Sequence, residues 1–214
     1  MITKFSPVLL AIIISMLTFV LVWRKNPHAK WIQLALCIFA FVTTTSHNLN
    51  HNYHFIFWLC NFTVLLGIGL CFRFHQTVFN VFFYFCWTGS LLTLFIFNNP
   101  VAPPMATNPV AFIGFILKHS IPIIMTIYFI RNSGHRLSEN AMMSSLKYMI
   151  GYAVFIAGYN MVFDQNILDF RYPTLEIEKA FGPWPIYVIV NIALAILWYK
   201  IIDIITKKLV LIQT

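Results

Sequence analysis

The sequence predicts an all-α membrane protein, a polytopic bundle of about seven transmembrane helices that form a single integral membrane domain over residues 1–214. Of the 214 residues, 60% are apolar and only 9% are charged, and the mean hydropathy is +0.79. A soluble domain has about 25% charged residues, so this chain cannot cover a globule with polar surface. The composition excludes cytosolic enzymes, secreted disulfide scaffolds and disordered chains, and predicts a multi-pass protein of the cell membrane.

Seven segments approach the roughly 20 apolar residues that a spanning helix needs. In order they lie near residues 7–23, 31–46, 55–72, 77–98, 110–130, 146–163 and 184–205. The first has more charge after it than before it and lacks a small-residue cleavage site, so it is interpreted as a retained helix rather than a signal peptide. The second can extend through the His-rich stretch that follows it. The connection 164–183 holds six charged residues and is expected to be a solvated loop or surface helix.

The distribution of Lys and Arg predicts the orientation. Nine of them fall in the C-terminal tail and in the loops that join the first segment to the second, the third to the fourth, and the fifth to the sixth. They are Arg24, Lys25, Lys30, Arg73, Arg131, Arg136, Lys147, Lys207 and Lys208. The opposite side holds three: Lys4, Arg171 and Lys179. The positive-inside rule then places the N-terminus outside and the C-terminus in the cytoplasm. The net charge of +8 is explained by this topology, and no nucleic-acid partner is expected.

Several polar residues should meet at one depth in the outer half of the membrane. Cys60 lies five residues into the third segment and His119 nine residues into the fifth, and both segments enter from outside. Asn160 and Asp164 lie at the outer end of the sixth and share a helix face because they are four residues apart. Intramembrane ionisable groups are functional candidates by default, so the sequence predicts one outward-facing site.

Cys60 is the candidate nucleophile of this site and His119 its candidate base, since a neutral imidazole can take the thiol proton and later protonate a leaving group. Cys60 could instead be a small buried hydrophobe, as Cys37, Cys71 and Cys86 are expected to be, and His119 could be structural. No CxxC pair occurs, which argues against a disulfide framework or a zinc knuckle. The candidate oxyanion or substrate-binding residues are Asn61, Ser120, Asn160, Lys118 and Asp164. Three interpretations of Lys118 stay open: snorkelling outward, pairing with Asp164, or contacting a lipid phosphate.

His47, His51 and His54 have the spacing i, i+4, i+7 and would share a face if the second helix continued outward. Three imidazoles at this spacing could bind zinc or copper. No carboxylate or thiol accompanies them locally, so they are weak metal candidates. No metal is expected for that reason. No cofactor is expected either, and the sequence has no GxGxxG, P-loop or GxSxG motif.

Several stretches together resemble a known family. They are Trp58-Leu59-Cys60-Asn61, Tyr84-Phe85-Cys86-Trp87-Thr88-Gly89 running on to Asn99-Pro100, Lys118-His119-Ser120, Tyr159-Asn160-Met161, and Gly182-Pro183-Trp184-Pro185-Ile186-Tyr187. Their order and spacing resemble the YwaF-type bacterial integral membrane proteins, whose animal relatives include an ether-phospholipid acyltransferase. The androgen-induced-gene hydrolases of fatty-acid esters are more distant relatives. Phe57-Trp58 stands where a His often precedes Leu-Cys in the bacterial pattern, which leaves His54 as the one source of a second imidazole.

The resemblance implies that Cys60 and His119 form a catalytic pair acting on membrane lipids. The resulting hypothesis is a membrane-embedded acyltransferase or hydrolase of lipid acyl esters, with membrane lipids as its substrate. The alternative is a transporter or ligand-binding membrane protein in which Lys118, His119 and Asp164 line a polar path. A heme- or metal-binding redox protein that uses the three clustered histidines and His119 is a third possibility. The sequence leaves the oligomeric state open.

Overall fold

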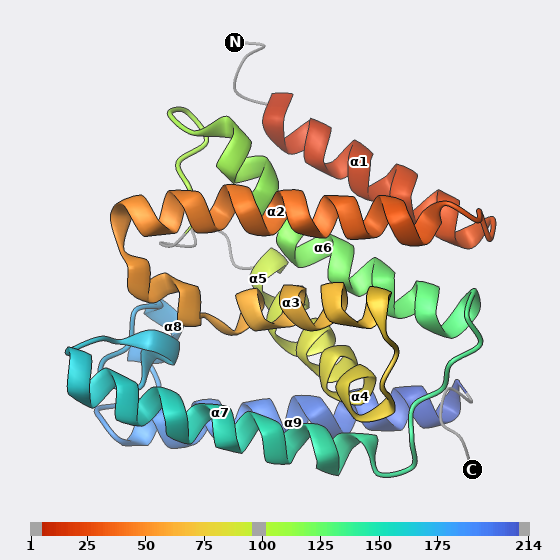
Figure 1. Ribbon diagram of the computed structural model, residues 1–214. Coiled ribbons are helices and arrows are strands. Elements are labelled where there is room, and N and C mark those ends of the chain that lie inside the picture. Colours follow the sequence, from red (N-terminus) through yellow and green to blue (C-terminus); the bar gives the residue numbers. More distant parts are fainter. Residues whose placement is uncertain (1–5, 96–101, 210–214) are drawn as a thin grey trace.

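A computed structural model describes residues 6–95 and 102–209, and these residues are helical with no strand among them (Figure 1). The elements are α1 (Ser6–Trp23), α2 (Ala29–His51), η1 (Tyr53–Phe57), α3 (Leu59–Phe72), α4 (Gln76–Phe85), η2 (Cys86–Ser90), α5 (Leu91–Phe95), α6 (Pro109–Arg131), α7 (Ala141–Phe163), η3 (Ile167–Asp169), α8 (Glu176–Lys179) and α9 (Ile186–Lys208). The helical class predicted from the sequence is therefore confirmed. The resemblance motif at Asn99-Pro100 lies outside the described residues.

Five helices in the described part of the chain are long and apolar enough to cross a membrane: α2, the continuous segment Gln76–Phe95, α6, α7 and α9. Two shorter apolar helices, Pro7–Trp23 and Leu59–Phe72, accompany them. A spanning helix in a bilayer of ordinary thickness needs about 20 residues. The multi-pass character is supported on this basis, while the count of seven passes and the orientation stay predictions.

The outer surface of the bundle is apolar. On α7, Val154 is 69% exposed, Met161 84% and Val162 75%. In the most apolar 18-residue stretch of each helix, only 17% of α9 and 11% of α7 is buried. Soluble monomers rarely expose so much apolar surface, whereas it is the expected lipid-facing surface of a membrane bundle.

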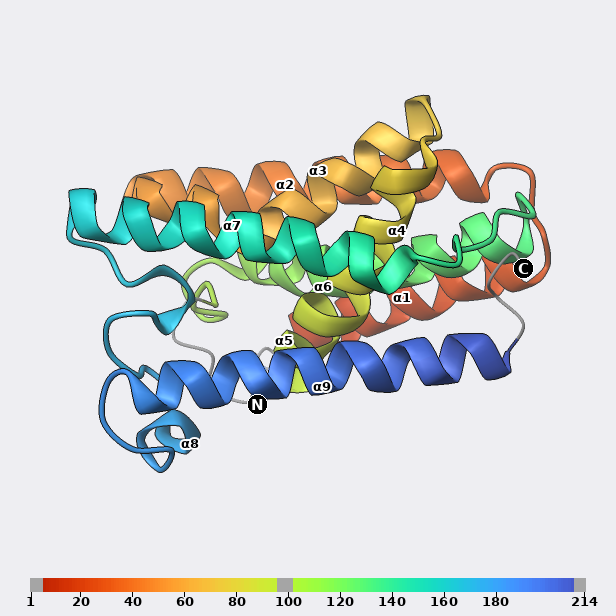
Figure 2. The same ribbon diagram turned by 90° about the horizontal axis from the view of Figure 1, so that it is seen from below.

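The interior is built around the segment formed by α4, η2 and α5, which crosses obliquely between the other helices (Figures 1 and 2). Every residue from Phe79 to Cys86 is buried. The turn Cys86–Ser90 is π-helical, a geometry that is rare and appears frequently at functional sites. This segment therefore lies inside the core, and the other helices cover it.

Helices α2 and α6 approach each other closely at Gly114. A Cβ at this position would lie 2.1 Å from Oγ1 of Thr43 on α2, so any larger residue would push the two helices apart. Pro122 lies inside α6. The close approach at Gly114 sets the position of α6 against α2, and with it the position of the buried Lys118 and His119 one turn further along α6.

The predicted third helix, 55–72, is interrupted in the structure. The chain leaves α2 at His51, makes the short 3-10 turn η1, and is extended at Trp58 (φ −66°, ψ 138°) before α3 begins at Leu59. The Asn61 amide donates to the carbonyls of Phe55 (2.9 Å) and Ile56 (3.2 Å). These carbonyls are therefore satisfied by a side chain, and the backbone does not need to continue as a helix.

Candidate active site

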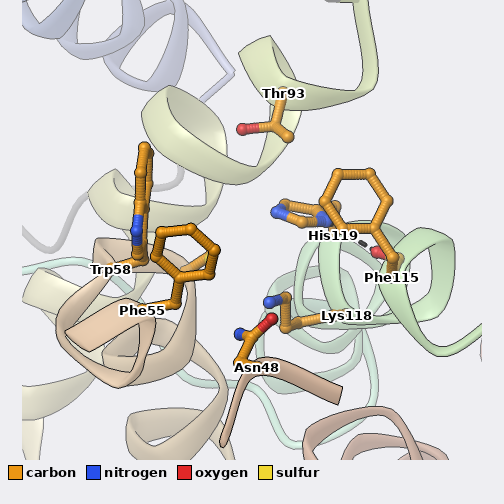
Figure 3. A pocket seen from close by; sticks show the side chains of 8 residues that line it. Asn48, Phe55, Trp58, Thr93, Phe115, Lys118 and His119 are labelled. Atoms are coloured by element: carbon orange, nitrogen blue, oxygen red, sulfur yellow. Dashed lines mark hydrogen bonds between the residues drawn. The ribbon is translucent and has the colours of Figure 1, made fainter. Parts of the chain in front are cut away.

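A small cavity of about 50 Å³ lies among the end of α2, η1, α3, α5 and α6. Figure 3 shows side chains that line it. The lining residues are Asn48, Phe55, Trp58, Cys60, Thr93, Phe115, Lys118 and His119. The cavity thus brings together Cys60, His119 and Lys118, three of the residues that the sequence predicted for one site.

His119 is held in one orientation by α6. It is 1% exposed, and its Nδ1 lies 2.6 Å from the carbonyl oxygen of Phe115, one turn earlier in the same helix. A carbonyl can only accept, so Nδ1 carries the proton of this hydrogen bond. A neutral imidazole in this tautomer keeps a free lone pair on Nε2. Figure 3 shows this second nitrogen turned toward the middle of the cavity, where it can serve as a proton acceptor.

Cys60 is the second residue of α3. All four cysteines are free thiols; Cys37, Cys71 and Cys86 are buried in the core, and Cys60 alone is partly exposed. The first turn of a helix carries a partial positive charge, a setting shared by many reactive cysteines. The structure therefore separates one partly exposed thiol, in a cavity that it shares with His119 and Lys118, from three thiols enclosed in the core.

Lys118 presents a buried cation to the same cavity. The residue is 3% exposed, and its Nζ donates to Oδ1 of Asn61 at 3.2 Å and lies 5.8 Å from the centre of the Phe115 ring. No carboxylate in the described part of the chain pairs with it. An uncompensated charge in a membrane interior costs several kcal/mol, so the cavity is suited to an anionic group.

Two of the open interpretations of Lys118 are therefore wrong. It does not snorkel, because its Nζ is held inside by Asn61. It does not pair with Asp164, which ends α7 in a left-handed conformation with its side chain 88% exposed and forms a salt bridge with Arg171. Asp164 is not among the residues that line the cavity. The polar path through Lys118, His119 and Asp164 is not formed.

The oxyanion donors predicted from the sequence are engaged elsewhere. Both N–H groups of the Asn61 amide go to the carbonyls before α3. Ser120 shares a 2.8 Å hydrogen bond with Ser15 of α1, and Asn160 binds the backbone of Ile167 through both its oxygen and its nitrogen. The amide of Asn160 ties the loop after α7 to the end of that helix. None of the three provides a free donor to Cys60.

Two lining residues that the sequence did not suggest are better placed. The indole Nε1 of Trp58 is buried and has no hydrogen-bond partner. Figure 3 shows the Asn48 amide pointing toward the Lys118 ammonium. A buried unpaired donor costs about 1–3 kcal/mol, so Trp58 is a candidate to bind an acceptor that enters the cavity. The sequence could have indicated Trp58 through its position directly before Leu59-Cys60. Asn48 lies in the His-rich stretch, where only the histidines were candidates.

The three clustered histidines do not lie on one helix face, because α2 ends at His51 and His54 lies in η1, so the helical continuation on which that expectation depended does not occur. His47 and His51 lie one turn apart on α2 with ring centroids 4.0 Å apart and ring planes tilted by 33°, and Nδ1 of His51 lies 2.8 Å from the His47 carbonyl oxygen. His54 lies beyond the end of α2, and its Nδ1 is 2.6 Å from the Tyr159 hydroxyl. Among the residues that the structure describes, no three His, Cys, Asp or Glu side chains are grouped to hold a metal ion. His54 does not line the Cys60 cavity either.

Comparison with known proteins places the chain in a family. No curated protein and no solved structure matches it at a significant level. The sequence model of the TMEM164 family matches residues 2–202, which is nearly the whole chain. This match agrees with the helical bundle and its apolar outer surface, because the TMEM164 family is a family of membrane proteins. The chain described here belongs to the TMEM164 family.

Proposed function

We propose that the protein is a thiol-dependent enzyme that transfers or hydrolyses the acyl group of membrane lipid esters, with Cys60 as nucleophile and His119 as base. The observation that carries the proposal is that these two side chains line one cavity while Nδ1 of His119 is committed to the Phe115 carbonyl. The base is thus oriented by a third group, which is the general pattern of an activated nucleophile.

The chemistry follows from the atoms in the cavity. Cys60 Sγ attacks the ester carbonyl while Nε2 of His119 accepts the thiol proton. The C–O bond then breaks, and His119 returns the proton to the departing alkoxide, leaving a thioester on Cys60. In the second half, His119 takes a proton from a lysolipid hydroxyl or from water, whose oxygen displaces the thiol. The Lys118 ammonium and the Trp58 indole N–H are the groups proposed to stabilise the negative oxygen of the tetrahedral intermediate.

The size of the cavity constrains how the substrate sits. A volume of about 50 Å³ accommodates an ester group and does not accommodate an acyl chain. The acyl chain is proposed to remain in the bilayer while only the ester enters, past the rings of Phe55, Trp58 and Phe115. A membrane lipid suits this arrangement better than a soluble ester, because its chain needs no protein pocket.

The proposal places the site in the outer half of a seven-pass bundle with the N-terminus outside. Support comes from the nine-to-three distribution of Lys and Arg and from the two shorter apolar helices beside the five long ones. Reporter fusions after Thr214 and within the 100–109 loop should report opposite compartments. Signals from the same compartment would contradict the topology.

The test of the catalytic pair is labelling with a lipid-like, thiol-reactive acyl ester analogue on the purified protein in detergent. Cys60→Ala should abolish labelling, whereas Cys37→Ala, Cys71→Ala and Cys86→Ala should not. His119→Gln should slow labelling by about 100-fold, within the range of general base catalysis, with the thermal unfolding midpoint as a control for folding. Labelling that persists in folded Cys60→Ala, or that is unchanged in His119→Gln, would refute the mechanism and favour the alternative of a ligand-binding membrane protein.

A further inference from the structure

A second and larger cavity lies where α1, α6 and α9 end together, a common end visible in Figure 2. Its volume is about 650 Å³. On α6 it involves residues from Thr126 to Arg131, and Arg131 lies twelve residues after His119, roughly 18 Å along the helix axis. Along α9 it extends from Trp198 to Leu209, the residue that follows the helix, over roughly 16 Å. It is therefore separate from the Cys60 cavity and elongated along the bundle.

Away from Trp23 and Arg131, the walls of this cavity are apolar, and the polar side chains among them are hydrogen-bonded within the protein. Nε1 of Trp87 donates to Oγ1 of Thr126 at 3.1 Å, and Nε1 of Trp198 donates to the Trp87 carbonyl at 2.9 Å. The hydroxyl of Thr206 donates to the carbonyl of Asp203 at 2.9 Å. Since these polar atoms are satisfied within the protein, the interior is suited to a hydrocarbon chain.

The end of the cavity carries a cation without a carboxylate. The Arg131 guanidinium stacks 4.0 Å from the centre of the Trp23 ring. No salt bridge to Arg131 occurs in the described residues, whereas Lys207 nearby is paired with Asp203 at 2.7 Å. Stacking covers one face of the guanidinium and leaves its N–H edges free, and these edges match the geometry of a phosphate.

We propose that this cavity binds one anionic phospholipid, with an acyl chain along α9 and the phosphate on Arg131. The cavity is apolar along α9 from Trp198 and carries a charge at its Arg131 end. A phospholipid likewise has an apolar chain and a charged headgroup. Arg24, Lys25 and Lys208 lie at the same end of the bundle and are exposed, so the surrounding field attracts negatively charged headgroups. This site goes beyond the proposed acyl-transfer function, since it shares no residue with the Cys60 cavity.

The headgroup part of the proposal is tested by native mass spectrometry of the purified protein with phosphatidylglycerol or phosphatidylcholine of identical chains. One phosphatidylglycerol should bind about tenfold more tightly than phosphatidylcholine, the range expected for a charged hydrogen-bonded contact. Arg131→Gln should remove this preference. Arg73→Gln is the matched control, because Arg73 is exposed, lies outside the cavity and carries the same charge. Equal binding of the two lipids, or a preference that survives Arg131→Gln, would overturn the proposal.

The chain-binding part is tested by filling the cavity. Ile204 and Ile205 are neighbours on α9 and are both 50% exposed, but only Ile205 lines the cavity. Ile205→Trp should abolish stoichiometric phosphatidylglycerol binding, and Ile204→Trp should retain it, with equal unfolding midpoints showing that both variants fold. Retained binding in folded Ile205→Trp would place the lipid elsewhere. Labelling of Cys60 should be unchanged in all four variants, so failure here is distinguishable from failure of the acyl-transfer proposal.

Discussion

The ammonium of Lys118 donates across 3.2 Å to the side-chain oxygen of Asn61, whose nitrogen holds the two backbone carbonyls just before α3. One amide therefore links α6 to the turn that delivers Cys60. Because an ammonium has three N–H groups and Asn61 takes one, the others can bind a ligand in the cavity. The contact holds the Lys118 ammonium inside the cavity, with its remaining N–H groups available to a ligand.

Lys118→Met should keep the fold and impair the chemistry. The substitution preserves most of the side-chain stem and removes a buried charge, so the unfolding midpoint should stay the same or rise. Labelling of Cys60 by the acyl analogue should slow by about 100-fold, as for loss of an oxyanion-stabilising group. Lys147→Met, at an exposed position of α7, is the control and should change neither quantity. Unimpaired labelling in Lys118→Met would remove Lys118 from the mechanism.

Trp58→Phe isolates the unpaired indole N–H. The variant keeps an aromatic ring and deletes a buried donor that has no partner in the structure, so stability should be maintained or rise by up to about 1 kcal/mol. The acylation rate should nevertheless fall by at least about tenfold. Trp198→Phe gives the opposite result, because the Trp87 carbonyl loses its donor: stability falls by about 1 kcal/mol and labelling is retained. A fully active Trp58→Phe would show that the N–H does not meet the substrate.

Asn160→Ala should be a stability variant rather than a catalytic one. Asn160 is 1% exposed and satisfies both the N–H and the carbonyl of Ile167. Its loss leaves these buried groups unpaired and should lower the unfolding free energy by about 2 kcal/mol. Limited proteolysis should show faster cleavage within 164–185, measured against Gln165→Ala, whose amide is less buried. A catalytic defect without faster proteolysis would restore the oxyanion role that the sequence suggested.

Asp169 should make stability depend on pH. Burial raises the pKa of its carboxyl to about 6, against a hydrogen bond from Thr174 and with the help of the nearby Glu178 carboxylate. The folded state therefore binds this proton more tightly than the unfolded state, whose pKa is about 3.9. The resulting stabilisation is complete below about pH 4 and is lost as the pH rises through about 6.

The measurement is the free energy of unfolding between pH 4 and 8 for the native chain and for Asp169→Asn. The native curve should fall relative to the variant, by about 1 kcal/mol once partial exposure is allowed for. Glu176→Gln, at an exposed carboxylate paired with Lys179, should track the native chain. Parallel curves for the native chain and Asp169→Asn would show that folding does not raise the pKa of the Asp169 carboxyl.

The helices and the shared depth of the site were predictable because both depend on quantities that a sequence contains. Apolar length marked the helical segments, apart from the break at Trp58 in the predicted third one, and the expected alternation of direction put Cys60 and His119 near the same level. The cavity that both line agrees with this reasoning. Neither the location of the helices nor the level of a residue along them depends on how a helix is rotated about its axis.

The roles of the amide and hydroxyl residues were not predictable, because they depend on that rotation. Ser120 follows His119 directly, yet one step of about 100° turns it toward Ser15 of α1. Asp164 lies one turn after Asn160, but α7 ends there and the left-handed residue points its carboxylate outward to Arg171. Residues four apart share a face only within one helix. Because α2 ends at His51, His54 likewise does not lie beside His47 and His51.

The π-helical turn at Cys86–Ser90 has a consequence for how this chain tolerates changes in length. Such a turn takes up one more residue than an α-helical turn, so Thr93, which lines the Cys60 cavity, sits about 100° away from where an unbroken α-helix would put it. Removing one residue from the turn would let the segment relax to a regular α-helix with Thr93 still facing inward. A one-residue gap here is therefore expected to be neutral, whereas the same gap among the buried residues before it would rotate that entire packed face.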